Sequence, residues 1–271
     1  MQISVNGQQL GHRTWGSSDN PPLVLMHSTS FGAWMWETVA SLLNDAYYVV
    51  ATDQRGHGDS PPATEDFEIE DLARDLKGAL DQLEVHDAVA AGHSSGSTTL
   101  LVCESLYPGT FSRLLMIEPI LTPDRNLATT PNPMAEQARR RRRLFDSPQA
   151  MFDSFRDRQP FATWTDEALH LYSQQGTEPT DAGVALKCDP ESEARMYESL
   201  MRLDPREHLA NIRCPVKLVR GADSDPMRAG MFEFARDMLK APAEVVPGAG
   251  HFIPQEQPST VARLIREFAA S

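Results

Sequence analysis

Residues 87–99 read Asp-Ala-Val-Ala-Ala-Gly-His-Ser-Ser-Gly-Ser-Thr-Thr, and the rest of the chain is best interpreted from this segment. A short apolar run leads into a Gly-x-Ser-x-Gly motif, and residues typical of a buried helix follow it. This order predicts a strand, a sharp turn and a helix, with the central Ser94 in a strained conformation. Its hydroxyl would be exposed at a helix N-terminus, where the N–H of Ser95 faces any negative charge that develops.

Apolar runs of strand length alternate with helical patterns on both sides of this segment. Strands are expected at residues 2–5, 9–14, 23–26, 47–51, 88–91, 114–117, 215–220 and 243–246. Between them, leucines recur at spacings of three and four in residues 69–83, which predicts an amphipathic helix. The alternation predicts the α/β class, with a doubly wound, mostly parallel sheet whose chemistry lies at the carboxyl ends of the strands.

The pattern changes between residues 121 and 205. Helices are expected at residues 134–145, 148–158, 165–175 and 191–202, with no convincing strand. We therefore interpret residues 121–205 as an inserted helical lid, here called the cap segment, and residues 1–120 and 206–271 as the core. One or two of its aromatic side chains are expected to line a pocket. The run Arg139 to Arg143 points all round a helix, so most of it should be solvated.

Composition narrows the classes of partner. The 271 residues contain 25 lysines and arginines against 38 aspartates and glutamates, a formal charge of -13 that disfavours nucleic acid and anionic membranes. The three cysteines are far apart and show no metal-type pairing, which favours a reducing cytoplasm. The N-terminus lacks a targeting pattern and no apolar run reaches membrane-spanning length. We expect a cytoplasmic protein with a small-molecule substrate, no cofactor and no metal; homo-oligomer formation is left open.

A serine hydroxyl is a poor nucleophile near neutral pH and needs a base and a carboxylate that orients the base. His251 follows the last expected strand in a glycine-flanked loop, and Asp223 and Asp225 follow the strand before it. Each of the three residue types therefore lies at the carboxyl end of a strand, in the order serine, aspartate, histidine. Glu118 also ends a strand, where it either faces the pocket or satisfies backbone groups, and the second role is favoured.

These residues resemble the α/β-hydrolase fold superfamily. The resemblance covers everything except the cap segment and rests on Leu25-Met26-His27, the run from Asp53 to Ser60, Gly92 to Gly96, Tyr107-Pro108, and Gly250-His251-Phe252 with Glu256 and Pro258. It implies that Ser94 is the nucleophile, that His251 is the general base, and that the N–H groups of Thr29 and Ser95 form the oxyanion hole. Serine at the nucleophile position disfavours relatives that use aspartate there, the epoxide hydrolases and haloalkane dehalogenases.

The sequence departs from the family pattern at two positions. Ser28 replaces the glycine that usually follows the histidine of the first motif, where its side chain would narrow the acyl side of the site or add a donor. The acid usually lies three residues after the strand-end glycine, whereas Asp223 lies two and Asp225 four residues after Gly221. Some relatives carry a Ser-Asp pair here, so Asp225 is favoured as the acid and Asp223 is kept as the alternative.

The leading hypothesis is a serine hydrolase that cleaves an ester or related acyl bond of a small, partly apolar molecule through an acyl-enzyme. Carbon–carbon bond hydrolysis, lactone hydrolysis and thioester hydrolysis use the same residues and stay open. A receptor that keeps the triad and binds a small molecule is an alternative of another class.

Overall fold

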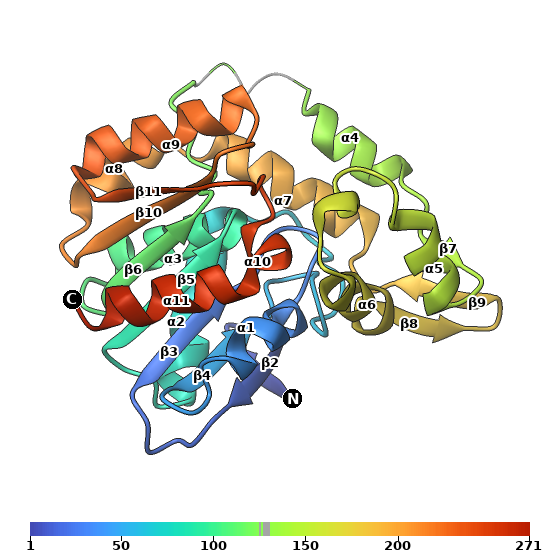
Figure 1. Ribbon diagram of the computed structural model, residues 1–271, viewed down its shortest axis with the longest axis horizontal. Helices are drawn as coiled ribbons and strands as arrows, with labels where there is room; N and C mark the ends of the chain where they lie inside the picture. The colour runs from blue at the N-terminus through green and yellow to red at the C-terminus, as the bar shows by residue number, and fades with distance from the viewer. Residues whose placement is uncertain (125, 127–130) are drawn as a thin grey trace.

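The computed structural model describes residues 1–124, 126 and 131–271. Its centre is an eight-stranded sheet with the order β1-β2-β4-β3-β5-β6-β10-β11 (Figure 1). The first two strands and the β2–β4 pair run antiparallel, and the remaining neighbours are parallel. The predicted doubly wound, mostly parallel sheet is confirmed. The strands are β1 (Gln2–Val5), β2 (Gln8–Trp15), β3 (Pro22–Met26), β4 (Tyr48–Thr52), β5 (Ala88–His93), β6 (Phe111–Ile117), β10 (Val216–Gly221) and β11 (Ala243–Val246).

Helices cover both faces of this sheet. One face packs against α2, α3, α8 and α9, and the other packs against α1 and α11 (Figure 1). No helix in the described part of the chain combines the length and the apolar composition needed to cross a bilayer. The helices of the core are η1 (Ala33–Trp36), α1 (Glu37–Ser41), α2 (Ile69–Gln82), α3 (Ser95–Leu106), α8 (Pro205–Asn211), α9 (Pro226–Leu239), α10 (Ile253–Glu256) and α11 (Pro258–Ala269).

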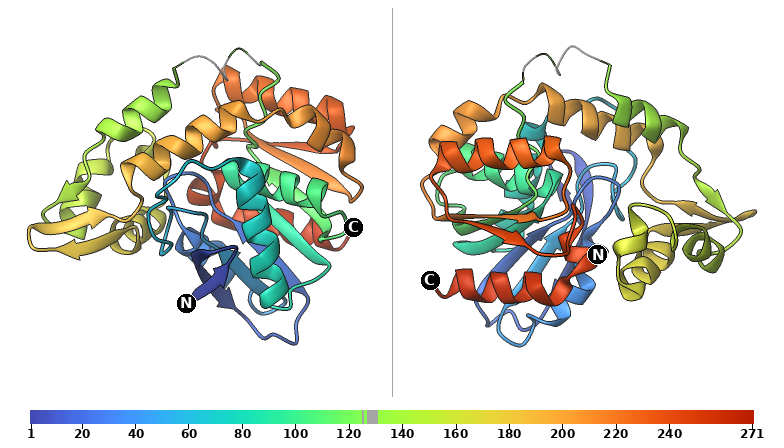
Figure 2. Two further views of the ribbon diagram at one scale, coloured as in Figure 1. Left: turned by 180° about the vertical axis from the view of Figure 1, so that it is seen from behind. Right: turned by 45° about the horizontal axis from the view of Figure 1, so that its top comes forward.

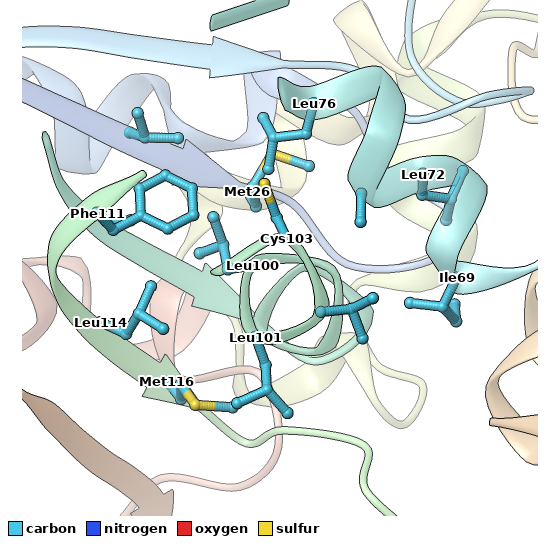
Figure 3. Packing of buried hydrophobic residues seen from close by; sticks show 14 of the residues in the cluster. Met26, Ile69, Leu72, Leu76, Leu100, Leu101, Cys103, Phe111, Leu114 and Met116 are labelled. Atoms are coloured by element: carbon cyan, nitrogen blue, oxygen red, sulfur yellow. The ribbon is translucent and has the colours of Figure 1, made fainter. Parts of the chain in front are cut away.

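The central strands are apolar over most of their length because each buries both faces. In β6, Leu114 and Met116 enter one hydrophobic cluster, whereas Leu115 and Ile117 enter the other. Figure 3 shows the first cluster, where side chains of α2 and α3 meet those of β3 and β6. Each fully buried side chain of this size contributes roughly 1.5–3 kcal/mol to the free energy of unfolding. The packed sheet therefore holds the ends of its strands in fixed positions.

The cap segment leaves the core after β6 and returns before β10. Both views of Figure 2 show it as a lobe beside the sheet. It holds the expected helices, but the prediction that it lacks strands was wrong, because it contains a small sheet with the order β7-β9-β8. The cap elements are α4 (Pro133–Arg140), β7 (Leu144–Phe145), α5 (Pro148–Phe155), η3 (Phe161–Thr163), α6 (Asp166–Gln175), β8 (Thr177–Thr180), β9 (Gly183–Leu186) and α7 (Pro190–Arg202).

The cap strands have local causes that a periodicity analysis overlooks. β8 and β9 form a hairpin whose turn ends at Gly183, with φ +125°, a conformation that favours glycine. Both strands have four residues, too few for alternation to stand out. The helix expected at residues 134–145 ends at Arg140, and the chain then becomes extended into β7.

Candidate active site

Ser94 lies between β5 and α3, at the turn that the sequence predicts. Its backbone has φ +55° and ψ −119°, a conformation that residues with a side chain rarely adopt. The N–H of Ser94 donates to the carbonyl of Ile117 at 2.9 Å, which ties the turn to the end of β6. Ser94 is 6% exposed and lines a cavity.

The turn requires glycine because neighbouring backbone approaches it closely. A Cβ at Gly96 would lie 2.3 Å from the carbonyl oxygen of Met26 and 2.5 Å from that of His27. A Cβ at Gly92 would lie 2.6 Å from the backbone nitrogen of Ser97. These backbone atoms cannot rotate away, so the motif spacing is a steric requirement of the strand–turn–helix unit.

Gly96→Ala is therefore expected to lower the free energy of unfolding by about 3 kcal/mol. Gly230→Ala is the matched control, because Gly230 is exposed within α9 and an added Cβ meets nothing within 4 Å. There, alanine should raise the free energy of unfolding by about 0.5–1 kcal/mol through helix propensity. Urea denaturation of both variants measures the two changes. Wild-type stability of Gly96→Ala would show that the close approach is absent in solution.

His251 and Glu118 form a buried pair. The Nδ1 atom of His251 lies 3.1 Å from Oε2 of Glu118, and the two side chains are 10% and 1% exposed. Because an ionised carboxylate only accepts, Nδ1 carries the proton and Nε2 is left free to act as a base. His93 contacts the backbone of the same residue, since its Nε2 is 2.8 Å from the carbonyl oxygen of His251.

Glu118 is held in place by the strand that follows the cap segment. Its Oε1 atom accepts from the N–H of Gly221 at 2.7 Å and from the hydroxyl of Ser224 at 2.5 Å. Glu118 therefore satisfies a backbone group, as expected, and also contacts the histidine, which was not expected. Its backbone has φ +52°, so it shares with Ser94 a strained strand-end conformation.

The expectation that Asp225 orients His251 does not agree with this geometry. Asp225 is the N-cap of α9, where Oδ1 accepts from the N–H of Arg228 at 3.1 Å and Oδ2 pairs with its guanidinium. Asp223 is exposed, and its N–H donates to the carbonyl of Ala249. Both aspartates line the cavity, but the carboxylate hydrogen-bonded to the imidazole is that of Glu118.

Burial and neighbouring charge set the protonation of the pair. Desolvation lowers the pKa of His251 well below its ordinary value of 6.5, and the positive charge of Arg228 lowers it further, whereas Asp225 opposes this shift. Burial raises the pKa of the Glu118 carboxyl, and the hydrogen bonds from Ser224 and Gly221 oppose that rise. The imidazole is therefore neutral at neutral pH.

The two N–H groups predicted for an oxyanion hole follow the neighbouring parallel strands β3 and β5. Ser95 is the first residue of α3, and Thr29 lies in the loop after β3 and lines the cavity. Among the described residues, no acceptor binds either N–H. Ser28 also lines the cavity, and its buried hydroxyl has no partner within the part of the chain that the structure describes.

The cavity has a volume of about 1130 Å³ and lies between the strand ends and the cap segment. Ser94 and His251 form part of its wall, and the cap contributes the aromatic side chains of Phe155, Phe161, Tyr172 and Tyr197. Phe155, Phe161 and Tyr172 also belong to the apolar cluster that joins the cap to the core, together with Trp164, which does not line the cavity. The cap aromatics thus serve both attachment and lining, but four of those described line the cavity where one or two were expected.

Comparisons with known proteins bear on the family and the fold of the chain. A family model described as "Alpha/beta hydrolase family" matches residues 23–264. The chain is 24% identical over 268 residues to 2-(acetamidomethylene)succinate hydrolase of Mesorhizobium japonicum, covering 98% of this chain and 94% of the relative. It is 25% identical over 259 residues to 3-oxoadipate enol-lactonase 2 of Acinetobacter baylyi, covering 94% and 91%. The crystal structure of E-2-(acetamidomethylene)succinate hydrolase matches with a TM-score of 0.89 at 23% identity, covering 100% and 98% of the two chains.

Proposed function

The chain belongs to the alpha/beta hydrolase family, and from this premise we propose that it is a serine hydrolase acting on an acyl bond through a triad of Ser94, His251 and Glu118. The observation that carries the proposal is the buried contact between His251 Nδ1 and Glu118 Oε2 beside a strained strand-end serine. An orienting carboxylate, a base with its other nitrogen free and a serine in one cavity are the parts that acyl transfer requires.

The proposed reaction follows from these positions. Ser94 Oγ attacks the acyl carbon while His251 Nε2 takes its proton, and the carbonyl oxygen becomes an oxyanion held by the N–H groups of Thr29 and Ser95. Collapse of this intermediate breaks the bond to the leaving group, which receives the proton from His251. Water then attacks the acyl-enzyme by the same steps, giving the acid and free Ser94. Glu118 stabilises the imidazolium at each stage.

The bond is proposed to be an ester or a related acyl bond of a small, partly apolar molecule, because the cap contributes aromatic rings to the cavity. Lactone opening is the second candidate, and the similarity to an enol-lactonase favours it. We propose residues 121–205 as the unit that selects the substrate and residues 1–120 and 206–271 as the unit that carries the triad. Among the cap side chains that line the cavity, Phe155, Phe161 and Tyr172 would contact the substrate.

Labelling with a small fluorophosphonate tests the proposal directly. The reagent should attach to Ser94, as located by peptide mass spectrometry, and should abolish turnover of p-nitrophenyl esters from acetate to decanoate. The chain-length optimum of that ester panel reports the depth of the acyl pocket. A protein that binds small molecules but is not labelled at Ser94 would be a receptor, and the proposal would fail.

The activity is expected to persist into mildly acidic solution. Only neutral His251 accepts the serine proton, so kcat/KM should rise with pH through the pKa of His251 and level off above it. Because burial and Arg228 lower that pKa, the midpoint should lie below 6.5. Arg228→Gln should move the midpoint to higher pH, whereas Arg263→Gln, which removes an exposed charge on α11, should not. A wild-type midpoint at or above 6.5 would contradict the electrostatic argument.

A further inference from the structure

Arg141 places a cationic group in the wall of the catalytic cavity. It is the first residue after α4, at the point where the chain turns from helix to extended backbone. Its side chain is 18% exposed and lines the same cavity as Ser94 and His251. The residue before it differs sharply, since the side chain of Arg140 is 81% exposed. Arg142 also lines the cavity, but it is exposed and its Nε donates to the carbonyl of Leu144, so Arg141 is the buried cationic group of the wall.

The guanidinium of Arg141 has more donors than the protein has acceptors for it. Its Nη2 donates to the carbonyl of Cys188 at 2.9 Å, and its Nε lies 2.8 Å from Oε2 of Glu193. The Tyr172 hydroxyl is a third contact. The Cys188 thiol is a fourth contact. A guanidinium carries five N–H donors, and the Nε of Arg141 has no hydrogen-bond partner among the described residues, so at least one donor is left over. A charged group buried with donors to spare is costly unless a ligand uses them.

Glu193 is itself bound by groups other than Arg141. The hydroxyl of Ser30, in the loop after β3, donates to Oε1 of Glu193, and the Tyr197 hydroxyl is a further hydrogen-bond partner. These hydroxyls stabilise the carboxylate independently of the arginine. The Arg141–Glu193 contact also lacks hydrogen-bond alignment, since both Arg141 Nε and Glu193 Oε2 are without a hydrogen-bond partner among the described residues. At 2.8 Å the two groups still form an ion pair, but the contact leaves the Nε N–H of Arg141 without an aligned acceptor, so the guanidinium keeps a donor for a second anion.

We infer that Arg141 binds a carboxylate group of the substrate, which makes the preferred substrate an acyl compound with a free carboxylate at a distance from the bond that is cleaved. This inference rests on the proposed function of the cavity. A guanidinium fork matches a planar carboxylate. The neighbouring Glu193 carboxylate disfavours a dianionic phosphate more strongly than a singly charged group. The apolar lining elsewhere accommodates the carbon chain between the two ends.

Binding of unreactive diacids tests the inference without turnover. Succinate, glutarate, adipate and pimelate are titrated into the whole protein by calorimetry at constant ionic strength. At least one should bind the wild type and Arg140→Gln, the matched control that removes the same charge from an exposed neighbour. Arg141→Gln should weaken that binding about 10- to 100-fold, the range for a charge-assisted bidentate contact. Arg141→Lys should keep part of the affinity, and inorganic phosphate should bind more weakly than the best diacid.

A variant of Glu193 separates recognition from a structural ion pair. If Arg141 only attaches the cap to the core, Glu193→Gln and Arg141→Gln should lower stability alike and reduce all activities alike. If Arg141 recognises substrate, Glu193→Gln should bind the diacid as well as the wild type or better, because a competing carboxylate is gone. Equal losses in both variants, or the absence of diacid binding to the wild type, would overturn the inference.

Paired esters give the corresponding kinetic result. Monoethyl diacid esters are compared with ethyl esters of unbranched fatty acids of equal carbon number, with acid release followed by pH-stat. Arg141→Gln should lower the ratio of kcat/KM values, charged over neutral ester, about 10- to 100-fold. Turnover of neutral esters without charged preference would refute the inference alone. Diacid binding without fluorophosphonate labelling of Ser94 would refute the proposed function alone.

Discussion

Replacement of Ser94 by alanine is expected to lower kcat on an activated ester by a factor on the order of 10⁴ to 10⁶ while the protein stays folded. The substitution removes only the Oγ atom that forms the acyl-enzyme. The N–H groups of Thr29 and Ser95 stay in place, so a small residual rate above the uncatalysed reaction should persist. Steady-state kinetics measures the loss, and thermal unfolding with circular dichroism checks that the fold is unchanged.

Ser105→Ala is the matched control for that experiment. Ser105 is a buried serine on the same helix α3, and its hydroxyl lies 3.1 Å from Nδ1 of His208, away from the cavity. Its loss should change stability slightly and leave kcat near the wild-type value. A Ser94→Ala variant that retains more than about a hundredth of wild-type turnover would rule out the acyl-enzyme, because general base activation of water would then account for the rate.

Glu118→Gln is expected to lower kcat by roughly 10⁴. The glutamine can still accept from Gly221 and Ser224 through its amide oxygen. The amide NH₂ then faces His251 Nδ1 as a donor and favours the tautomer whose Nε2 carries the proton, which cannot accept a proton from Ser94. The amide also removes the negative charge that stabilises the imidazolium. Steady-state kcat, with the urea unfolding midpoint as a check on folding, measures the effect.

The companion variant Asp225→Asn should keep kcat within about 10-fold of wild type, since Asp225 caps α9 and pairs with Arg228. Asparagine is an equally good N-cap, and the loss of the partly exposed ion pair costs little stability. The two variants together decide the identity of the acid. A large loss of kcat in Asp225→Asn with a small loss in Glu118→Gln would identify Asp225 as the acid, as the sequence favoured.

Most of the sheet could be predicted because its strands bury both faces. Continuous apolar runs such as Leu114 to Ile117 have few alternatives in a chain of this composition. The turn at Ser94 could also be predicted, because the glycine spacing around it reflects close contacts with neighbouring backbone that only glycine permits. The cap strands β8 and β9 could not be predicted, since their pairing depends on one left-handed glycine and on very few residues.

The acid was harder to predict than the nucleophile. Three carboxylates, Glu118, Asp223 and Asp225, all follow strands that end at the same edge of the sheet. One-dimensional spacing does not say which of them reaches the histidine, because that depends on the direction of each side chain after its strand. The position of Glu118 did indicate a role at the site, since it follows the strand next to the one that leads into Ser94. Hydrogen bonding to backbone groups, however, was a sufficient explanation for a carboxylate at that position.

For a related reason, the sequence alone could not distinguish Arg141 from the neighbouring arginines. The sequence treats the five arginines as one helical run, and in a continuous helix no single member is distinguished. The structure ends α4 at Arg140, so Arg141 takes an extended backbone and a different direction. Helix termini are among the least predictable features of a sequence, and here one terminus separates the exposed Arg140 from the buried Arg141.

The position of Glu118 bears on how this enzyme can diversify. The proposed nucleophile, Ser94, and the proposed acid, Glu118, directly follow the adjacent strands β5 and β6, and both precede the cap segment along the chain. Insertions, deletions or recombination between β6 and β10 therefore alter the walls of the cavity while the segment that encodes both residues is inherited intact. Only His251 follows the cap segment, so strands β10 and β11 must return it to its position beside Glu118. Selection on such a gene can vary substrate choice and chemistry almost independently.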